Sequence, residues 1–308
     1  MFIVTYRKFF YTFSLVLVIG SIVALSVWGL KPGIDFKGGS IIEVEYASST
    51  RPTSAELAPA LTALNLGEYS IRETGTAGFI IRTPELSPEQ HNAVISALET
   101  STTTEKLSLT EKRFDSVGPI LGKEALQKSW MSILLVLLAI VIFITFAFRG
   151  VSKPVKSWKY GVIAIIALAH DVILPSGVFA LLGHTLGFEV DTLFVTALLV
   201  VLGFSIHDTI VVFDRVRENL KHNVEEKQKK TFDVIVGESI NQTFVRSINT
   251  SLTTLIAIFV LYLIGAEATQ HFALALLIGI TAGTYSSIFL GSPLLVTVYK
   301  WQEGKKAK

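Results

Sequence analysis

One stretch of this sequence places a charge where a membrane helix would not ordinarily carry one. Residues 200–219 read VVLGFSIHDTIVVFDRVREN, so that Asp208 lies inside an apolar run and the chain becomes polar only near Asp214. An aspartate at the centre of a bilayer costs roughly 3 kcal/mol on insertion scales. Acidic side chains that proteins retain in such positions often bind or relay protons. Asp208 is therefore the first candidate for chemistry in this chain.

A basic residue follows near the start of the next apolar run. If the two runs form antiparallel helices, Arg246 lies at a depth similar to that of Asp208. Burial disfavours a charged carboxylate and a nearby guanidinium favours it, so the separation of the two helices would set the protonation of such a pair. Asn249, Thr250 and Thr253 follow Arg246 at helical intervals and form one polar stripe. We predict a proton pathway through these residues; the alternative is a static ion pair that fixes helix packing.

Asp171 is a second acidic residue inside an apolar run. It lies near the middle of residues 160–182, and Pro175, one helical turn later, loosens the helix there. Its carboxylate is either a further proton relay or a hydrogen-bonding group that holds the helices together. His170 and His207 each precede one of the aspartates. Adjacent helix positions point about 100° apart, so neither histidine need contact its neighbour's site.

The sequence offers little other chemistry. It contains no cysteine, which excludes disulfides and thiolate metal sites. It has no Ser/His/Asp combination and no phosphate-binding glycine motif, and His91 is isolated on a predicted helix. We expect no enzyme activity, no metal site, no nucleic-acid partner and no cofactor, with the proton as the only coupling ion.

The elements that position the two aspartates are predicted to be transmembrane helices. Half of the residues are hydrophobic and the mean hydropathy is +0.55, which is unlike a soluble domain. The last apolar run carries several glycines and Pro293, so we expect a tilt or a break in it. Six runs approach the length that spans a bilayer, at residues 9–30, 130–148, 160–182, 191–213, 248–265 and 271–299.

Lysine and arginine residues indicate the orientation of these helices. They occupy the N-terminal segment, the links after the second and fourth runs, and the C-terminal tail, whereas residues 183–189 and 265–270 contain none. The positive-inside rule then predicts that the lipid bilayer is crossed six times, with both termini and a loop at about 214–247 in the cytoplasm. A cleaved signal peptide is the less favoured interpretation of residues 9–30, because the run is longer than a usual signal.

Residues 31–129 are predicted to form a small periplasmic domain between the first two helices. Thr53 with Glu56, and Ser87 with Gln90, have the spacing of helix capping boxes. The predicted order is β-α-β-β-α-β, the ferredoxin-like α+β arrangement. We divide the chain into residues 1–30, 31–129 and 130–308, and interpret the domain as a docking module. Its elements are expected at residues 38–47, 52–64, 68–74, 78–84, 87–100 and 104–117.

Four ordered motifs resemble one known family. Residues 33–40 (GIDFKGGS) and 117–126 (VGPILGKEAL) are similar to sequences in the SecD/SecF family of bacterial protein-export membrane subunits. Residues 203–219 and 240–257 (INQTFVRSINTSLTTLIA) resemble the SecF branch in particular. The resemblance covers nearly the full chain and implies membership of the resistance-nodulation-division superfamily.

The resemblance also implies a function. Members of this branch pair with SecD, associate with the SecYEG channel and YajC in the bacterial inner membrane, and use the proton motive force to promote late steps of preprotein export. It further implies that Asp208, Arg246 and Thr250 take part in proton flow. Two alternatives are a half-transporter of the same superfamily that exports a lipid or drug, and a translocon scaffold without ion coupling.

Small residues in the last apolar run suit close helix contact. We expect part of this surface to meet SecD, with packing inside the same helix bundle as the alternative. The residues are Gly279, Ala282, Gly283, Ser286, Ser287 and Gly291.

Overall fold

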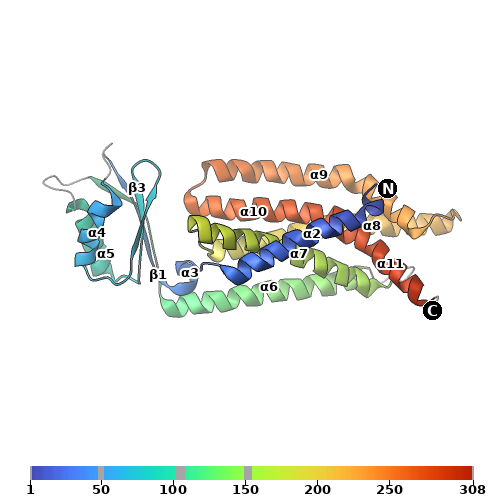
Figure 1. Cartoon of the computed structure of the whole chain (residues 1–308), viewed down its shortest axis with the longest axis horizontal. Coiled ribbons are helices and arrows are strands. Elements are labelled where there is room, and N and C mark those ends of the chain that lie inside the picture. Colours follow the sequence, from blue (N-terminus) through green and yellow to red (C-terminus); the bar gives the residue numbers. More distant parts are fainter. Residues whose placement is uncertain (1, 48–51, 101–107, 149–154, 307–308) are drawn as a thin grey trace. The chain divides into compact units, whose positions relative to one another are not determined.

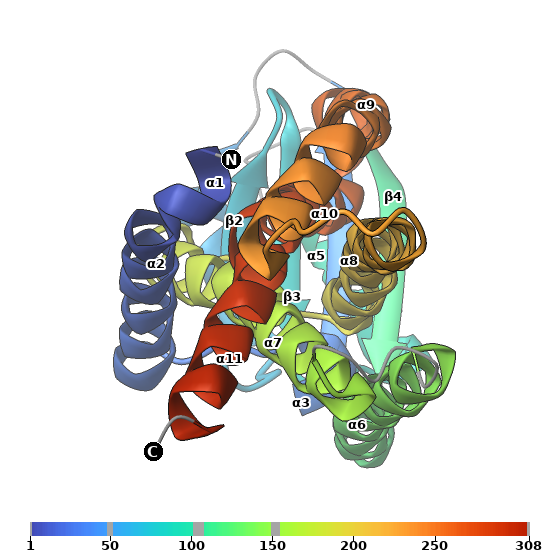
Figure 2. The ribbon, with the colours of Figure 1, turned by 90° about the vertical axis from the view of Figure 1, so that its right-hand side faces the viewer.

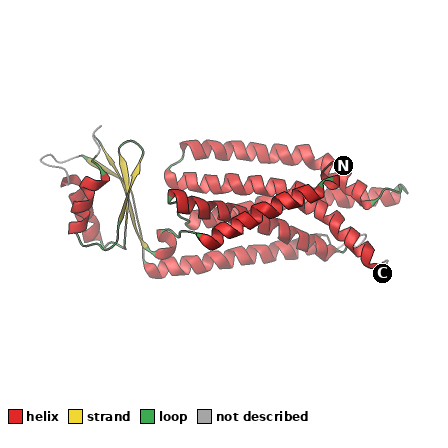
Figure 3. Cartoon of the chain, viewed as in Figure 1, coloured by secondary structure: helices red, strands yellow, loops and turns green. Residues whose placement is uncertain are grey.

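The computed structural model describes residues 2–47, 52–100, 108–148 and 155–306 (Figure 1). These residues form two compact units. One unit contains residues 1–31 and 131–308, and the other contains residues 32–130. Figure 3 shows that the first unit is helical, whereas the second combines helices with strands.

Six helices are long and apolar enough to cross a membrane, and they coincide with the six predicted runs. The fifth helix begins well before its apolar run, inside the polar segment that precedes it. A short helix, α1 (Phe2–Thr5), precedes the first of them. The spans are α2 (Arg7–Val27), α6 (Pro119–Ala147), α7 (Ser157–Leu186), α8 (Thr192–Glu225), α9 (Phe232–Ile264) and a composite last span within residues 269–304.

The last span is interrupted, as its glycines and proline predict. It consists of α10 (Glu267–Tyr285), the π-helix η1 (Ser286–Gly291) and α11 (Ser292–Lys306). The wider turn is closed by Ser292, whose hydroxyl donates to the carbonyl oxygen of Ser287, five residues earlier, at 2.8 Å. Turns of this kind are rare and occur often at functional sites.

The last span lies against several other helices, including α2, which contacts η1. It contacts α7, α8 and α9, and Figure 2 shows it flanked by them. Residues in the spans of α7, α8 and the last helix are mostly buried, whereas α6 and α9 leave most of their side chains exposed. Many of the buried polar residues of this unit accordingly belong to α7, α8 and the last span.

Small residues allow the helices to approach closely within this bundle. A Cβ atom added to Gly279 would lie 2.3 Å from Val201 Cγ2 of α8, and one added to Gly283 would lie 2.8 Å from Ser205 Cβ. Ala282, Ser286 and Ser287 are also buried. These positions therefore pack inside the same helix bundle, which is the alternative stated for this surface, and a contact of the last span with SecD stays a prediction.

The second unit contains a four-stranded antiparallel sheet with the strand order β2-β3-β1-β4. The order of strands and helices along the chain is the predicted one, and residues 104–107 of the last predicted strand lie outside the described residues. The elements are α3 (Ile34–Lys37), β1 (Gly39–Tyr46), α4 (Ser54–Ala63), β2 (Ser70–Thr74), β3 (Gly78–Thr83), α5 (Pro88–Thr100) and β4 (Leu109–Val117).

One face of this sheet forms the core of the unit. Alternate residues of β1 are buried there, and the apolar faces of α4 and α5 cover them. Both predicted capping boxes are present: the Thr53 backbone N–H donates to Glu56 Oε2 at 2.7 Å, and the Ser87 N–H donates to Gln90 Oε1 at 2.9 Å. The principal core residues are Ile42, Val44, Tyr46, Leu57, Leu61, Phe79, Ile81, Val94 and Leu98.

Two glycines open the first strand at a crowded position. Gly38 and Gly39 have φ angles of +80° and +127°, which side chains rarely tolerate. A Cβ on Gly38 would lie 2.8 Å from the Cα of Pro119, and one on Gly39 would lie 2.7 Å from the carbonyl oxygen of Thr83. The double glycine therefore fits both the backbone conformation and the close approach of neighbouring backbone.

The contact between α2 and α7 provides a test of packing. A Cβ on Gly177 would lie 2.3 Å from Ser21 Cβ, so we expect Gly177→Ala to destabilise the membrane unit by about 1–3 kcal/mol. The matched control is Gly203→Ala, whose Cβ would meet nothing within 4 Å and which should stabilise its helix by up to about 1 kcal/mol. Thermal unfolding in detergent measures both changes, and equal melting temperatures for the two variants would contradict the prediction.

Candidate functional site

Asp208 is buried in the membrane unit, with 2 % of its surface exposed. Its Oδ2 atom accepts a hydrogen bond of 3.3 Å from the Ser251 hydroxyl of α9. The Ser251 hydroxyl in turn accepts from Thr284 Oγ1 of α10 at 2.7 Å. A chain of two hydroxyls from two helices thus leads to the carboxylate.

The predicted partner of Asp208 lies elsewhere. Arg246 is exposed, and among the described residues it forms no ion pair with Asp208. The reason is helical geometry: Ser251 faces Asp208, and a residue five positions earlier on the same helix points about 140° away from it. This structure therefore does not bring Arg246 and Asp208 together, and their joint role in proton flow stays a prediction.

The polar stripe that begins at Arg246 is a genuine feature of α9 but faces outward. Asn249, Thr250 and Thr253 are all exposed. The Thr250 hydroxyl donates to the Arg246 carbonyl oxygen at 2.9 Å, and the Thr253 hydroxyl donates to the Thr250 carbonyl oxygen at 2.9 Å. The two threonine hydroxyls are thus satisfied by their own helix, and the stripe points away from Asp208.

Arg246 borders a polar cavity of about 290 Å³ between α8 and α9. Charged and amide side chains from both helices surround it. On the α8 side, Asp214 pairs with Arg217 at 3.8 Å and Arg215 pairs with Glu218 at 2.8 Å. The cavity is lined by Ile210, Val211, Asp214, Arg215, Glu218, Gln242, Thr243 and Arg246.

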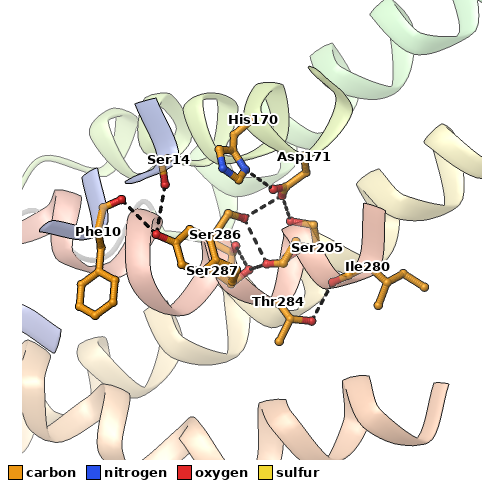
Figure 4. Close-up of polar contacts among 12 residues, drawn as sticks. Phe10, Ser14, His170, Asp171, Ser205, Ile280, Thr284, Ser286 and Ser287 are labelled. Atoms are coloured by element: carbon orange, nitrogen blue, oxygen red, sulfur yellow. Dashed lines mark hydrogen bonds and ion pairs between the residues drawn. The ribbon is translucent and has the colours of Figure 1, made fainter. Parts of the chain in front are cut away.

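Asp171 has the more elaborate surroundings of the two aspartates (Figure 4). It is fully buried. Its Oδ2 atom accepts hydrogen bonds from Ser205 of α8 and, at 2.8 Å, from Ser286 of η1. Its Oδ1 atom lies 2.9 Å from Nδ1 of His170. The Asp171 carboxylate of α7 thus contacts one side chain each from α7, α8 and η1.

The ring of His170 contacts the carboxylate of Asp171, the next residue in the sequence. The ring is buried and stacks against Tyr285, with centroids 6.1 Å apart. The Tyr285 hydroxyl donates to the carbonyl oxygen of Phe10 in α2 at 3.0 Å. His207, by contrast, is exposed. The two histidines that precede the aspartates thus have different surroundings.

The π-helix connects these contacts to α8. The Ser287 hydroxyl lies 2.9 Å from the Thr209 hydroxyl and 3.2 Å from the carbonyl oxygen of Ser205. Thr209 is the neighbour of Asp208, and Ser287 is the neighbour of the Asp171 ligand Ser286. The two carboxylates consequently lie on two sides of one short segment, residues 284–287.

Sequence reasoning missed the hydroxyl groups of this site. Ser205, Ser251 and Ser286 each contact a buried aspartate, and all three are buried. For Ser286 the sequence carries one signal, the serine and threonine residues that cluster in the last span, whereas Ser205 in α8 and Ser251 in α9 have no such signal. Single serines are common in membrane helices, so their contacts could not be assigned without the helix orientations.

The immediate partners of the two buried carboxylates are mostly hydroxyl groups. Among the described residues, no group of three or more histidine and acidic side chains is placed to hold a metal ion. Within the same residues, neither aspartate forms an ion pair with lysine or arginine. Each carboxylate instead meets neutral hydroxyls, which can both donate and accept a hydrogen bond. A carboxyl group in such surroundings can keep its partners in either protonation state.

Comparisons with known proteins agree on one family. The model for the C-terminal region of the SecD/SecF protein-export membrane proteins matches residues 97–301, and the model for the SecD/SecF GG motif matches residues 23–50. The second match includes the double glycine at the start of β1.

Relatives and a solved structure extend the match. The protein translocase subunit SecF of Thermobaculum terrenum is 43 % identical over 306 residues, covering 96 % of this chain and 93 % of the relative. That of Anaerolinea thermophila is 38 % identical over 300 residues, covering 97 % and 93 %. The crystal structure of SecDF, a translocon-associated membrane protein from Thermus thermophilus, superposes with a TM-score of 0.79 at 31 % identity.

That superposition covers 97 % of this chain but only 38 % of the SecDF chain, so this chain corresponds to less than two fifths of that protein. The SecF relatives, in contrast, match along nearly their whole length. Because a family model covers more than half of the residues and full-length relatives exceed 30 % identity, this multi-pass membrane chain belongs to the SecD/SecF family of protein-export membrane proteins, and within it to SecF.

Proposed function

We propose that this chain is an accessory subunit of the Sec protein translocase that works with SecD and uses the proton motive force to promote late steps of preprotein export. The family relationship supports the role in export. The observation that supports proton coupling is the pair of buried carboxylates, Asp171 and Asp208, held by hydroxyl groups and not by lysine or arginine among the described residues. A proton that crosses the membrane releases about 2.3 kcal/mol per 100 mV.

In this proposal Asp208 is the principal proton-binding group. The hydroxyls of Ser251 and Thr284 supply a short relay to it. A groove of about 260 Å³ between α9 and α10 includes both of these residues in its lining. Asp171 serves as a second group on the same pathway.

Arg246 and the stripe formed by Asn249, Thr250 and Thr253 act on the outer side of α9. An exposed charged residue and an exposed amide are costly against lipid, so we infer that a partner helix or water covers this face. SecD is the proposed partner, in keeping with the SecDF structure that this chain resembles. Arg246 would approach Asp208 only if α9 rotates during the transport cycle, which makes their contact a property of another conformational state.

The sheet unit is proposed to be a ferredoxin-like domain in the periplasm. Its element order and its strand order β2-β3-β1-β4 are those of that fold. The distribution of lysine and arginine supports a cytoplasmic location for both termini. The membrane that the helices cross is proposed to be the bacterial inner membrane. The SecYEG channel, YajC and the emerging preprotein are the further proposed partners, and the domain is the part of this chain that would meet the preprotein.

Replacement of Asp208 by asparagine tests the coupling. We expect Asp208→Asn to reduce preprotein export to the level of a strain that lacks this chain, because the amide keeps the shape and the Ser251 contact but cannot take up a proton. Export is measured in cells, and co-purification with SecD reports assembly. Normal export from an assembled complex would contradict the proposal.

The matched control is Asp214→Asn on the same helix. Asp214 is exposed and pairs only loosely with Arg217, so its neutralisation should leave export nearly unchanged. If both variants fail equally, charge loss on α8 affects the complex in general and the specific role of Asp208 is refuted.

Single cysteines test the orientation, since the natural sequence contains none. We expect Thr110→Cys, on exposed β4, to react with a membrane-impermeant maleimide in intact spheroplasts, because the positive-inside rule places the sheet unit outside the cytoplasm. Lys229→Cys, in the link between α8 and α9, should react only after the membrane is opened. The reverse pattern of labelling would invert the proposed orientation.

A further inference from the structure

We infer that His170 and Asp171 act together as one proton-binding centre, separate from Asp208, in which the added proton resides on Asp171 Oδ2 and Ser286 then reverses its hydrogen bond. The residues involved are shown in Figure 4. The inference rests on the proposed proton coupling for its purpose, whereas proton uptake by the centre can be measured independently of export.

The hydrogen bonds of the centre leave one atom unused. Asp171 Oδ2 accepts from Ser205 and Ser286, so a charged carboxylate is also satisfied at Oδ1 if Nδ1 of His170 carries the hydrogen. The other ring nitrogen, Nε2, then has a free lone pair. This atom is buried and has no hydrogen-bond partner among the described residues. An unsatisfied polar atom of this kind requires an explanation, and a place within a centre that exchanges protons is one.

The charge of the centre points the same way. With a charged carboxylate and a neutral ring, the buried pair carries one negative charge, and within the described part of the chain no lysine or arginine pairs with it. One added proton neutralises the pair whether it resides on the ring or on the carboxyl group. Because the two groups are in direct contact, the affinity for this proton belongs to the pair and not to either residue alone.

Few other titratable groups face this pair. Tyr285 of the last span stacks on the ring of His170. On α2, Ser14 donates to the Tyr285 hydroxyl at 3.4 Å but does not titrate. On α8, Asp208 lies one turn beyond Ser205 and contacts Ser251 instead. The pair therefore has its own hydrogen-bond shell, separate from that of Asp208.

Ser286 has two acceptors for its single hydroxyl hydrogen. One is Asp171 Oδ2 at 2.8 Å, and the other is the carbonyl oxygen of Gly283 at 3.1 Å. When a proton binds Oδ2, an O–H bond forms there and the carboxyl group donates to Ser286 Oγ. The serine then donates to Gly283, so its hydroxyl hydrogen keeps an acceptor.

The reversal is passed to the neighbouring residue through a shared acceptor. The Gly283 carbonyl oxygen also accepts from Ser287 at 2.8 Å, and Ser287 contacts Thr209 of α8. A second donor at Gly283 competes with the first, which favours donation by Ser287 toward α8. A change in the protonation of Asp171 would thus alter the hydrogen bond between Ser287 of the π-helix and Thr209 of α8, the helix that carries Asp208.

Infrared difference spectroscopy between high and low pH tests the inference on the purified complex of the full chain with SecD. We expect a carbonyl-stretching band from protonated Asp171 that disappears in Asp171→Asn and persists in Asp208→Asn. Ser286→Ala should shift this band to higher frequency, because the carboxyl group loses its hydrogen-bond acceptor. The matched variant Ser176→Ala removes another buried hydroxyl, in α7, which donates to the Val172 carbonyl oxygen and not to Asp171, and it should leave the band in place.

The outcomes separate this inference from the proposed function. A wild-type spectrum without a band that depends on Asp171, or the same band position in wild type and Ser286→Ala, would overturn it. Failed coupling at Asp208 with an intact Asp171 band would refute the proposed function alone. If Asp171→Asn does not assemble with SecD, Ser205→Ala and Ser286→Ala carry the test, since both remove a contact of the carboxyl group and leave the acid itself in place.

Discussion

A polar side chain buried among membrane helices must find its partners on those helices, because lipid offers none. In this chain that constraint determines how the bundle is arranged. Asp171 and Asp208 are satisfied by hydroxyls from α8, α9 and the last span, and glycines at 279 and 283 bring the last span close enough to α8 for these short side chains to reach. Removing the close approach would leave the carboxylates without partners.

The π-helix follows from the same constraint. An α-helix through residues 286–291 would present its serines about 100° apart at each step, whereas the wider turn changes the direction of every residue beyond it. Here Ser286 faces Asp171 and Ser287 faces Thr209, so that adjacent residues serve different helices. The hydroxyl of Ser292 compensates part of the backbone irregularity by donating to the carbonyl oxygen of Ser287.

The sequence predicted where the helices and strands lie along the chain better than which face of each helix points into the bundle. Apolar length and capping residues located six spans and the strands and helices of the sheet unit, because these signals are local. The burial of Asp171 and Asp208 was also predictable, since hydrocarbon tolerates charge only inside a bundle. The orientation of α9 was not: Arg246 and Ser251 are both polar, and only packing against α8 and α10 decides which of them faces the core. The roles of Ser205 and Ser286 depend on contacts between distant spans, for which a single sequence carries no local signal.

The link between the first and last spans has a consequence for biosynthesis. Ser14 and the Phe10 carbonyl oxygen in α2 both bond to the hydroxyl of Tyr285, which lies 271 residues after Ser14 along the chain. At roughly 5–20 residues per second, a ribosome needs on the order of 15–50 seconds to cover that distance. During this interval the first helix is already in the membrane without the partner that completes its polar contacts. Until the final helix is inserted, these two polar groups of α2 must find other partners.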